Sequence, residues 1–248
     1  MANDVLGWFG KLPSTGDFVQ RRLPSDFVQA WDDWLAQELG SWQSAEPDGW
    51  LTAYLAGPSW RFVLLPGCLA GLERIEDGMA GVLMPSVDRV GRYFPLTIAW
   101  ALPVAPGAGG AVHRLFAQLR EVDNLALEAV QNDWTVQQLD DALASHTHRH
   151  TPSPQVGRER GTGQMPASGM ADELAWRGDI VSTLADIAIA GLFDCWRGVS
   201  LWWSEALPGH PRLRVGTGLP RGDSFIELFQ ATTPPESEPS DSIGGLPP

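Results

Sequence analysis

The densest group of chemically active side chains in this sequence lies between residues 81 and 96. A serine, an aspartate and two arginines separate two apolar runs that have the character of strands: Ser86, Asp88, Arg89 and Arg92. A tight hairpin needs only a short turn such as Asn-Gly between its strands. The stretch therefore carries more polar chemistry than a turn requires.

Two interpretations of this polar group are open, and they are compatible. In the structural one, Asp88 caps a turn and pairs with Arg89 or Arg92, which fixes the corner between the strands. An exposed ion pair contributes only about 0–1 kcal/mol, so stability alone is a weak reason for such a pair. In the functional one, the arginines form a rigid surface patch that binds carboxylates of a partner, because a guanidinium group holds a carboxylate through paired hydrogen bonds.

Enzymatic chemistry at the same place would need a further group. Ser86 and Asp88 could serve a serine hydrolase, but the nucleophile needs a base within hydrogen-bond reach. None of the five histidines is tied to Ser86 by spacing.

The best candidate for a metal site is a group of three histidines. If the segment is extended, His146, His148 and His150 alternate onto one side, and three neutral imidazoles can hold zinc. The competing interpretation is the solvated end of a helix, and Arg149 inside the group favours it. We expect no metal and no cofactor.

Other catalytic signatures are missing from the sequence. The segment from Gly7 to Lys11 lacks the glycine spacing of a phosphate-binding loop, and the third glycine after Gly216-Thr-Gly218 comes one residue too late for a dinucleotide site. No Gly-x-Ser-x-Gly elbow surrounds a serine. These observations favour a binding protein over an enzyme.

Composition narrows the choice of partner. The chain has 248 residues, of which 44% are hydrophobic and 19% charged, and its formal net charge is −13. These proportions are typical of a globular protein. An acidic surface repels phosphate backbones and anionic lipids, so we expect neither nucleic-acid binding nor membrane insertion.

Compartment signals point to the cytoplasm. The N-terminal residues lack the basic region of an export signal, and glycines and a proline interrupt the apolar residues that follow. The uncharged run 94–112 contains Pro95, Pro103 and Pro106, which predict a strand and a loop rather than a membrane span. Cys68 and Cys195 stand in apolar surroundings and are expected to be reduced core residues.

Periodicity predicts interleaved helices and strands. Helices are expected at 26–39, where Gly40 stops the first one, at 50–55, at 112–130, after a capping box at Thr135–Gln138, at 180–187, and after a second box at Ser224–Glu227. Strands are expected at 5–12, 60–66, 81–85, 94–102, 199–203 and 213–215. The segment 151–169 is expected to be a mobile loop, and 232–248 a disordered acidic, proline-rich tail.

The expected fold is a single α+β domain over residues 1–231. Its central sheet should be mixed but mostly antiparallel and packed by helices, because the strands near residues 60, 82 and 96 follow too closely for helical crossovers. Trp31, Trp34 and Trp50 should face the core. Trp202 and Trp203 must point to opposite sides of one strand, so one of them lies under a helix or is available to a partner.

Several blocks, taken in order, resemble a known family. They are Gly7-Trp-Phe-Gly-Lys-Leu-Pro13, Gly16-Asp-Phe18, Arg22-Leu-Pro24, Trp31-Asp-Asp-Trp-Leu35, Trp60-Arg-Phe62, Pro85 to Arg92, Phe94-Pro-Leu96, Ser200-Leu-Trp-Trp203 and Gly218-Leu-Pro220. The series is similar to the TagF (ImpM) family, accessory proteins of bacterial type VI secretion.

The resemblance implies a cytoplasmic, non-enzymatic regulator without catalytic residues. Such proteins restrain secretion after translation by binding a forkhead-associated scaffold protein. We expect the residues facing that partner to be Asp17, Arg22, Asp88, Arg89 and Arg92. Charge reversal at Arg89 and Arg92 should abolish scaffold binding and leave the melting temperature nearly unchanged. The alternatives are a structural component of the secretion apparatus and a metal-dependent hydrolase. The oligomeric state is left open.

Overall fold

Every described strand belongs to one open sheet. The computed structural model describes residues 5–69, 78–102, 111–150, 196–205 and 211–230, and for 111, 112 and 147–150 the backbone only. The strands are β1 (Gly7–Gly10), β2 (Val19–Arg21), β3 (Trp60–Leu64), β4 (Gly78–Met84), β5 (Leu96–Leu102), β6 (Val199–Ser204) and β7 (Arg212–Thr217). Their order across the sheet is β2-β1-β5-β4-β3-β6-β7.

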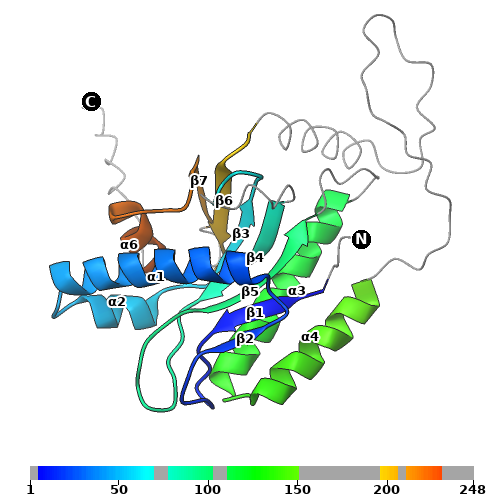
Figure 1. Cartoon of the computed structure of the whole chain (residues 1–248), viewed down its shortest axis with the longest axis horizontal. Coiled ribbons are helices and arrows are strands. Elements are labelled where there is room, and N and C mark those ends of the chain that lie inside the picture. Colours follow the sequence, from blue (N-terminus) through cyan, green and yellow to red (C-terminus); the bar gives the residue numbers. More distant parts are fainter. Residues whose placement is uncertain (1–4, 70–77, 103–110, 151–195, 206–210, 231–248) are drawn as a thin grey trace, which may run out of the picture.

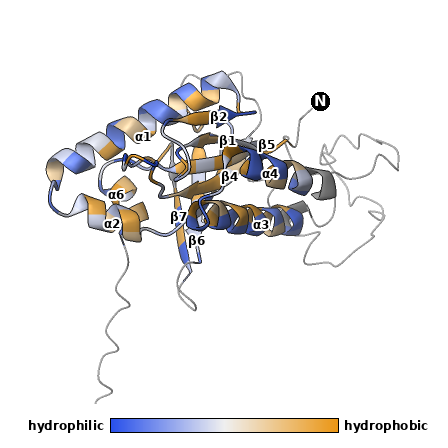
Figure 2. Ribbon diagram, turned by 90° about the horizontal axis from the view of Figure 1, so that it is seen from below, coloured by the Kyte–Doolittle hydropathy of each residue, from blue (hydrophilic) through white to orange (hydrophobic). Residues whose placement is uncertain are grey.

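Helices cover both faces of this sheet, which gives three layers (Figure 1). The helices are α1 (Ser25–Ala45), α2 (Trp50–Ala56), α3 (Ala111–Gln131), α4 (Val136–His150) and α6 (Asp223–Phe229). Figure 2 shows α1, α2 and α6 on one side of the strands and α3 and α4 on the other. The prediction of a single α+β domain is confirmed. The sheet is not mixed, however, because every pair among the described strands is antiparallel.

Two hydrophobic clusters hold the layers together, one on each face of the sheet. Alternate residues of β3 supply both: Trp60, Phe62 and Leu64 face α1, α2 and α6, whereas Val63 joins the cluster beneath α3 and α4. All seven residues of β4 are buried. A strand covered on both faces loses the apolar–polar alternation of a half-exposed strand, which explains why the central strands read as continuous apolar runs.

Tryptophans fill much of the first cluster. The Trp31 ring lies 4.7 Å from Trp34 and 6.1 Å from Trp202 between ring centroids. Trp31, Trp34 and Trp50 are buried, as expected. Trp203 points to the opposite face, where the Phe116 ring of α3 lies 4.9 Å away. Neither tryptophan of the Trp202–Trp203 pair is therefore left for a partner.

Gly40 does not stop α1, contrary to the sequence prediction. The helix continues to Ala45, and Trp42, beyond the glycine, is buried. The apolar face thus extends past Gly40, and its burial outweighs the poor helix propensity of one glycine, which is about 1 kcal/mol. The helix ends just before Pro47, where the residue preceding a proline disfavours helical geometry.

The two predicted capping boxes have different outcomes. At the start of α4, the Gln138 side chain accepts a hydrogen bond from the Thr135 backbone N–H at 2.8 Å, and the Gln138 N–H donates to the Thr135 hydroxyl at 3.3 Å. The second box is wrong: α6 begins after Gly222 with no side-chain cap, and Glu227 pairs with Arg214. The short strand β2 was not predicted.

Some of the other sequence predictions concern described residues, and some concern residues outside the described ranges. Cys68 is a buried free thiol, and burial raises its pKa to about 12 against the opposing effect of the Ser200 hydroxyl. No helix in the described ranges is long and apolar enough to cross a membrane. The predicted loop at 151–169, the helix near 180–187, Cys195 and the tail 232–248 lie outside the described residues.

The two boxes make a matched test of helix capping. Replacing Thr135 with Ala should lower the free energy of unfolding by about 1 kcal/mol, because the first turn of α4 loses its side-chain acceptor. Replacing Ser224 with Ala should change it by no more than a few tenths. Urea unfolding at pH 7 measures both, and an equal loss in the two variants would contradict the assignment.

Candidate partner-binding site

The turn between β4 and β5 is organised around one carboxylate. Asp88 Oδ1 accepts the backbone N–H groups of Val90 at 3.0 Å and Arg92 at 2.9 Å. Its Oδ2 accepts Arg92 Nε at 2.7 Å and lies 3.3 Å from Lys11 Nζ. Gly91 provides the left-handed backbone of this turn, with φ of +83°. We call Asp88 with Lys11 and Arg92 the Asp88 anchor.

Two members of the anchor, Asp88 and Lys11, lie inside the protein, whereas the side chain of Arg92 is 53% exposed. The side chain of Asp88 is 0% exposed and that of Lys11 only 5%. Burial by itself would raise the pKa of Asp88, but the backbone N–H and guanidinium of Arg92, then Lys11 and Val90, outweigh it and hold the pKa well below its usual range. Asp88 is therefore ionised at neutral pH and organises its surroundings. From this buried position it cannot contact a partner, which corrects its assignment as a partner-facing residue.

The anchored turn also holds the loop that follows β1. The Arg89 backbone N–H donates to the Thr15 carbonyl at 2.7 Å, and Arg92 Nη2 donates to the Gly16 carbonyl. Lys11 Nζ lies 4.8 Å from the centre of the Phe18 ring, a cation–π contact. Segments separated by about seventy residues in the sequence are thereby fixed against each other.

Ser86 has a structural role in the same turn. Its hydroxyl donates to the Lys11 carbonyl at 2.8 Å, and its backbone N–H and C=O both bond the Tyr54 hydroxyl, at 3.0 and 2.9 Å. Burial raises the pKa of Tyr54, so its hydroxyl stays neutral and can donate. Ser86 is only 2% exposed. These contacts give no support to Ser86 as a nucleophile.

The histidine group does not have the extended geometry that a zinc site would need. Residues 146–150 are part of α4, and positions two apart on a helix do not face the same way. His146 is buried, with Nδ1 3.2 Å from Glu121 Oε2. The side chains of His148 and His150 lie outside the described residues, and no group of three metal-binding side chains occurs in the rest.

Three of the five predicted partner-facing residues meet on one exposed face. Asp17, Arg89 and Arg92 are exposed, and the apolar side chains of Phe18 and Val90 beside them are 44% and 64% exposed. We call these five residues the outer face. Arg22 lies elsewhere: it follows β2, donates to the Leu6 carbonyl at 2.8 Å, and pairs with Asp140 of α4 at 2.9 Å.

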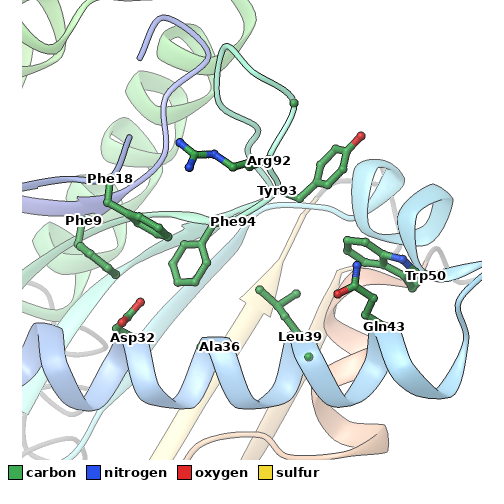
Figure 3. Close-up of a pocket in the computed structure, with 12 residues that line it drawn as sticks. Phe9, Phe18, Asp32, Ala36, Leu39, Gln43, Trp50, Arg92, Tyr93 and Phe94 are labelled. Carbon is green, nitrogen blue, oxygen red and sulfur yellow. The ribbon is translucent and has the colours of Figure 1, made fainter. Parts of the chain in front are cut away.

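A groove of about 800 Å³ begins at this outer face and runs along α1. One wall is mainly aromatic, and Figure 3 shows its rings facing the helix. The lining residues are Phe9, Phe18, Asp32, Ala36, Leu39, Gly40, Gln43, Trp50, Gly91, Arg92, Tyr93 and Phe94. We call this the aromatic groove. Rings with a few polar groups at the rim are typical of protein-binding surfaces.

Sequence reasoning found Asp88, Arg89 and Arg92 of this site but missed Lys11 and the apolar part. Lys11 stands between Gly10 and Leu12, and nothing in that spacing signals that it meets Asp88. Gly10 has a φ of +130° and lies against the Pro95 carbonyl, a close approach that brings the two segments together. The groove rings Phe18 and Phe94 do occur in the blocks that carried the family resemblance.

Comparison with known proteins identifies the family. The model of the TagF N-terminal domain, described as type VI secretion system-associated, matches residues 7–146. The chain belongs to this family. A similar solved structure is that of PA0076 from Pseudomonas aeruginosa PAO1, with 32% identity, a TM-score of 0.63, and coverage of 98% of this chain and 100% of that one. No curated protein matches the sequence.

The match covers the groove and the anchor together. Every residue of the Asp88 anchor, the outer face and the aromatic groove lies within the matched range 7–146. The TagF match therefore concerns the part of the chain that carries this site, and the protein has a type VI secretion-associated role.

The depressed pKa of Asp88 predicts an acid-sensitive contribution to stability. The folded pKa lies below the unfolded value of 3.8, so the anchor contributes fully above about pH 4, and the contribution is lost as the pH falls from there through the folded pKa. Replacing Asp88 with Asn should lower the free energy of unfolding at pH 7, because Lys11 stays buried without its counter-charge. The difference in the free energy of unfolding between the wild type and this variant should become smaller between pH 4 and pH 2.

Replacement of the exposed Asp48 with Asn is the control, and it should leave the free energy of unfolding at pH 7 unchanged. Urea unfolding measured at several pH values separates the two. A gap for the Asp88 variant that stays constant from pH 7 to pH 2 would contradict the anchored, ionised carboxylate.

Proposed function

We propose that this protein is a cytoplasmic repressor of type VI secretion that acts after translation by binding a forkhead-associated scaffold protein. The observation that carries the proposal is the coincidence of the family match with the outer face and the aromatic groove. Binding, with no catalytic step, is the proposed means of action.

The chemistry of the site suits a protein partner. The rings of the groove can bury apolar side chains of the scaffold, and buried aromatic anchors dominate most protein interfaces. Arg92 lines this groove with its guanidinium bonded to Asp88, and the exposed side chain of Arg89 beside it adds a cation at this end of a chain of net charge −13. A carboxylate of the scaffold would bind the Arg89 guanidinium through paired hydrogen bonds.

Occupancy is sufficient for repression under a simple condition. If the scaffold has an assembly-competent and an incompetent state, a ligand shifts the balance only by its difference in affinity for the two. A rigid binding face raises the affinity for the state that it fits, because little conformational entropy is lost when it binds, and a state of different shape fits a rigid face less well. The Asp88 anchor supplies that rigidity by fixing the turn and the loop at residues 15–18.

The two arginines are expected to differ when their charge is reversed. The Arg92 guanidinium bonds the buried Asp88, so Arg92→Glu would place two carboxylates together and lower stability. The sequence-based expectation of an unchanged melting temperature is therefore restricted to Arg89, which uses its backbone N–H for the loop and leaves its side chain exposed.

Arg89→Glu should weaken capture of the purified scaffold at least tenfold, which corresponds to about 1.4 kcal/mol, while the melting temperature stays within a degree or two of the wild type. Arg120→Glu is the matched control, since Arg120 is an exposed arginine on α3, on the opposite face of the sheet. Titration calorimetry and thermal unfolding supply the two readouts. Equal binding by the Arg89 and Arg120 variants would remove the outer face from the proposal.

The cellular experiment is deletion of the gene, followed by immunoblotting of the culture medium for the secreted tube protein. The proposal predicts increased release, which the wild-type and Arg120→Glu genes reverse and the Arg89→Glu gene does not. Abolished release would instead indicate a required structural component. Unchanged release would contradict a role as a brake.

A further inference from the structure

The aromatic groove has a floor shaped for an occupant. Asp32, Ala36, Gly40 and Gln43 lie three or four residues apart, so they form one stripe along α1. The opposite wall is formed by rings from two segments, β1 with the loop after it (Phe9 and Phe18) and the turn between β4 and β5 (Tyr93 and Phe94), with Trp50 at one end, as Figure 3 shows. The stripe is about 16 Å long, from a rise of 1.5 Å per residue, which is the length of about five extended residues.

Gly40 keeps this floor open. Glycine is, after proline, the least favourable residue inside a helix. A Cβ at Gly40 would meet no atom within 4 Å, so packing inside the chain does not require glycine at this position. The missing side chain leaves the centre of the stripe accessible to a chain lying along it.

Aromatic grooves of this kind bind extended, proline-bearing segments. Proline keeps a segment in the polyproline II conformation, so little entropy is lost when its rings stack on aromatic side chains. At the outer face, the exposed Arg89 adds positive charge next to the end of the groove that Gly91 and Arg92 line, whereas Arg92 is already paired with Asp88. The favoured ligand is therefore an extended segment that has both prolines and acids.

The chain itself contains such a segment after α6. Residues 231–248 include Pro234, Pro235 and Pro239. The acids of the segment, Glu236, Glu238 and Asp241, lie between and just after these prolines, and this stretch contains no lysine or arginine. Its charge is thus opposite to that of Arg89 and Arg92.

The segment starts close to the groove. Phe229, at the end of α6, packs against Trp42 and Tyr54, with ring centroids 5.7 and 5.3 Å away. Trp50, at the end of the groove, packs against the same two rings at 6.2 and 6.0 Å. Eighteen residues in polyproline II conformation span about 56 Å, which exceeds the length of the stripe several-fold.

We propose that the aromatic groove binds the chain's own segment 231–248, with its prolines on the rings and its acids at Arg89. The bound segment covers the outer face. A segment in the groove would compete with the scaffold for the same surface. This effect on scaffold binding rests on the proposed function.

The test places a photoreactive group in the segment of the full-length protein. In the variant Ser240→p-benzoylphenylalanine, irradiation followed by peptide mass spectrometry should give cross-links to residues 32–43 or 89–94. Cross-links to other parts of the chain, or none above the unirradiated sample, would overturn the proposal.

Two further substitutions keep the test independent of folding. Gly40→Leu fills the floor of the groove and should reduce the cross-link yield about tenfold. Ser41→Leu adds the same side chain to the next exposed position, outside the groove, and should leave the yield unchanged. Equal yields in both variants, with melting temperatures matched, would overturn the assignment to the groove.

Mixing labelled and unlabelled protein distinguishes one chain from two. Cross-links within one chain support the proposal, and cross-links that join a labelled to an unlabelled chain overturn it in favour of a second copy. No scaffold is present, so failure here leaves the secretion proposal standing. With both correct, Glu236→Gln, Glu238→Gln and Asp241→Asn together should tighten scaffold binding about tenfold, given an effective concentration near 1 mM and a dissociation constant near 0.1 mM for the segment.

Discussion

The candidate site depends on one buried carboxylate. Asp88 accepts two backbone N–H groups and is neutralised by Lys11 and Arg92, and these contacts hold the turn between β4 and β5 in one conformation. Arg92 then reaches the loop after β1, and Ser86 links the turn to Lys11 and to Tyr54 of α2. Without the carboxylate, two cations and two backbone donors would have no common acceptor.

A buried ion cluster of this kind is a poor way to gain stability and a good way to gain a fixed shape. Desolvation of the charges offsets most of their attraction, but removal of any one member leaves the others uncompensated. The turn is therefore held firmly at modest net gain. That property suits a binding face, where Arg89, Val90 and Phe18 must stay exposed in a defined arrangement next to the aromatic groove.

Local patterns in the sequence predicted the elements well but not the contacts between distant segments. The helical face of Trp31, Trp34 and Leu35 and the capping box at Thr135 follow from spacing within a few residues, and both are confirmed. The prediction that Gly40 ends α1 was wrong, because burial of Trp42, two residues after it, outweighs the poor helix propensity of glycine. The turn cap by Asp88 and its pair with Arg92 were predicted and are confirmed, but the exposed setting was the wrong expectation, because the carboxylate is buried with Lys11, which is remote in the sequence.

The most direct test of the account is hydrogen–deuterium exchange of the full-length protein with and without the purified forkhead-associated scaffold. The account predicts that the scaffold slows exchange in residues 12–18 and 89–94 and along the groove side of α1, and that exchange in α3 and α4 is unchanged. Slower exchange confined to α3 and α4, or no change while binding is detected by another method, would contradict the site on the outer face and the aromatic groove.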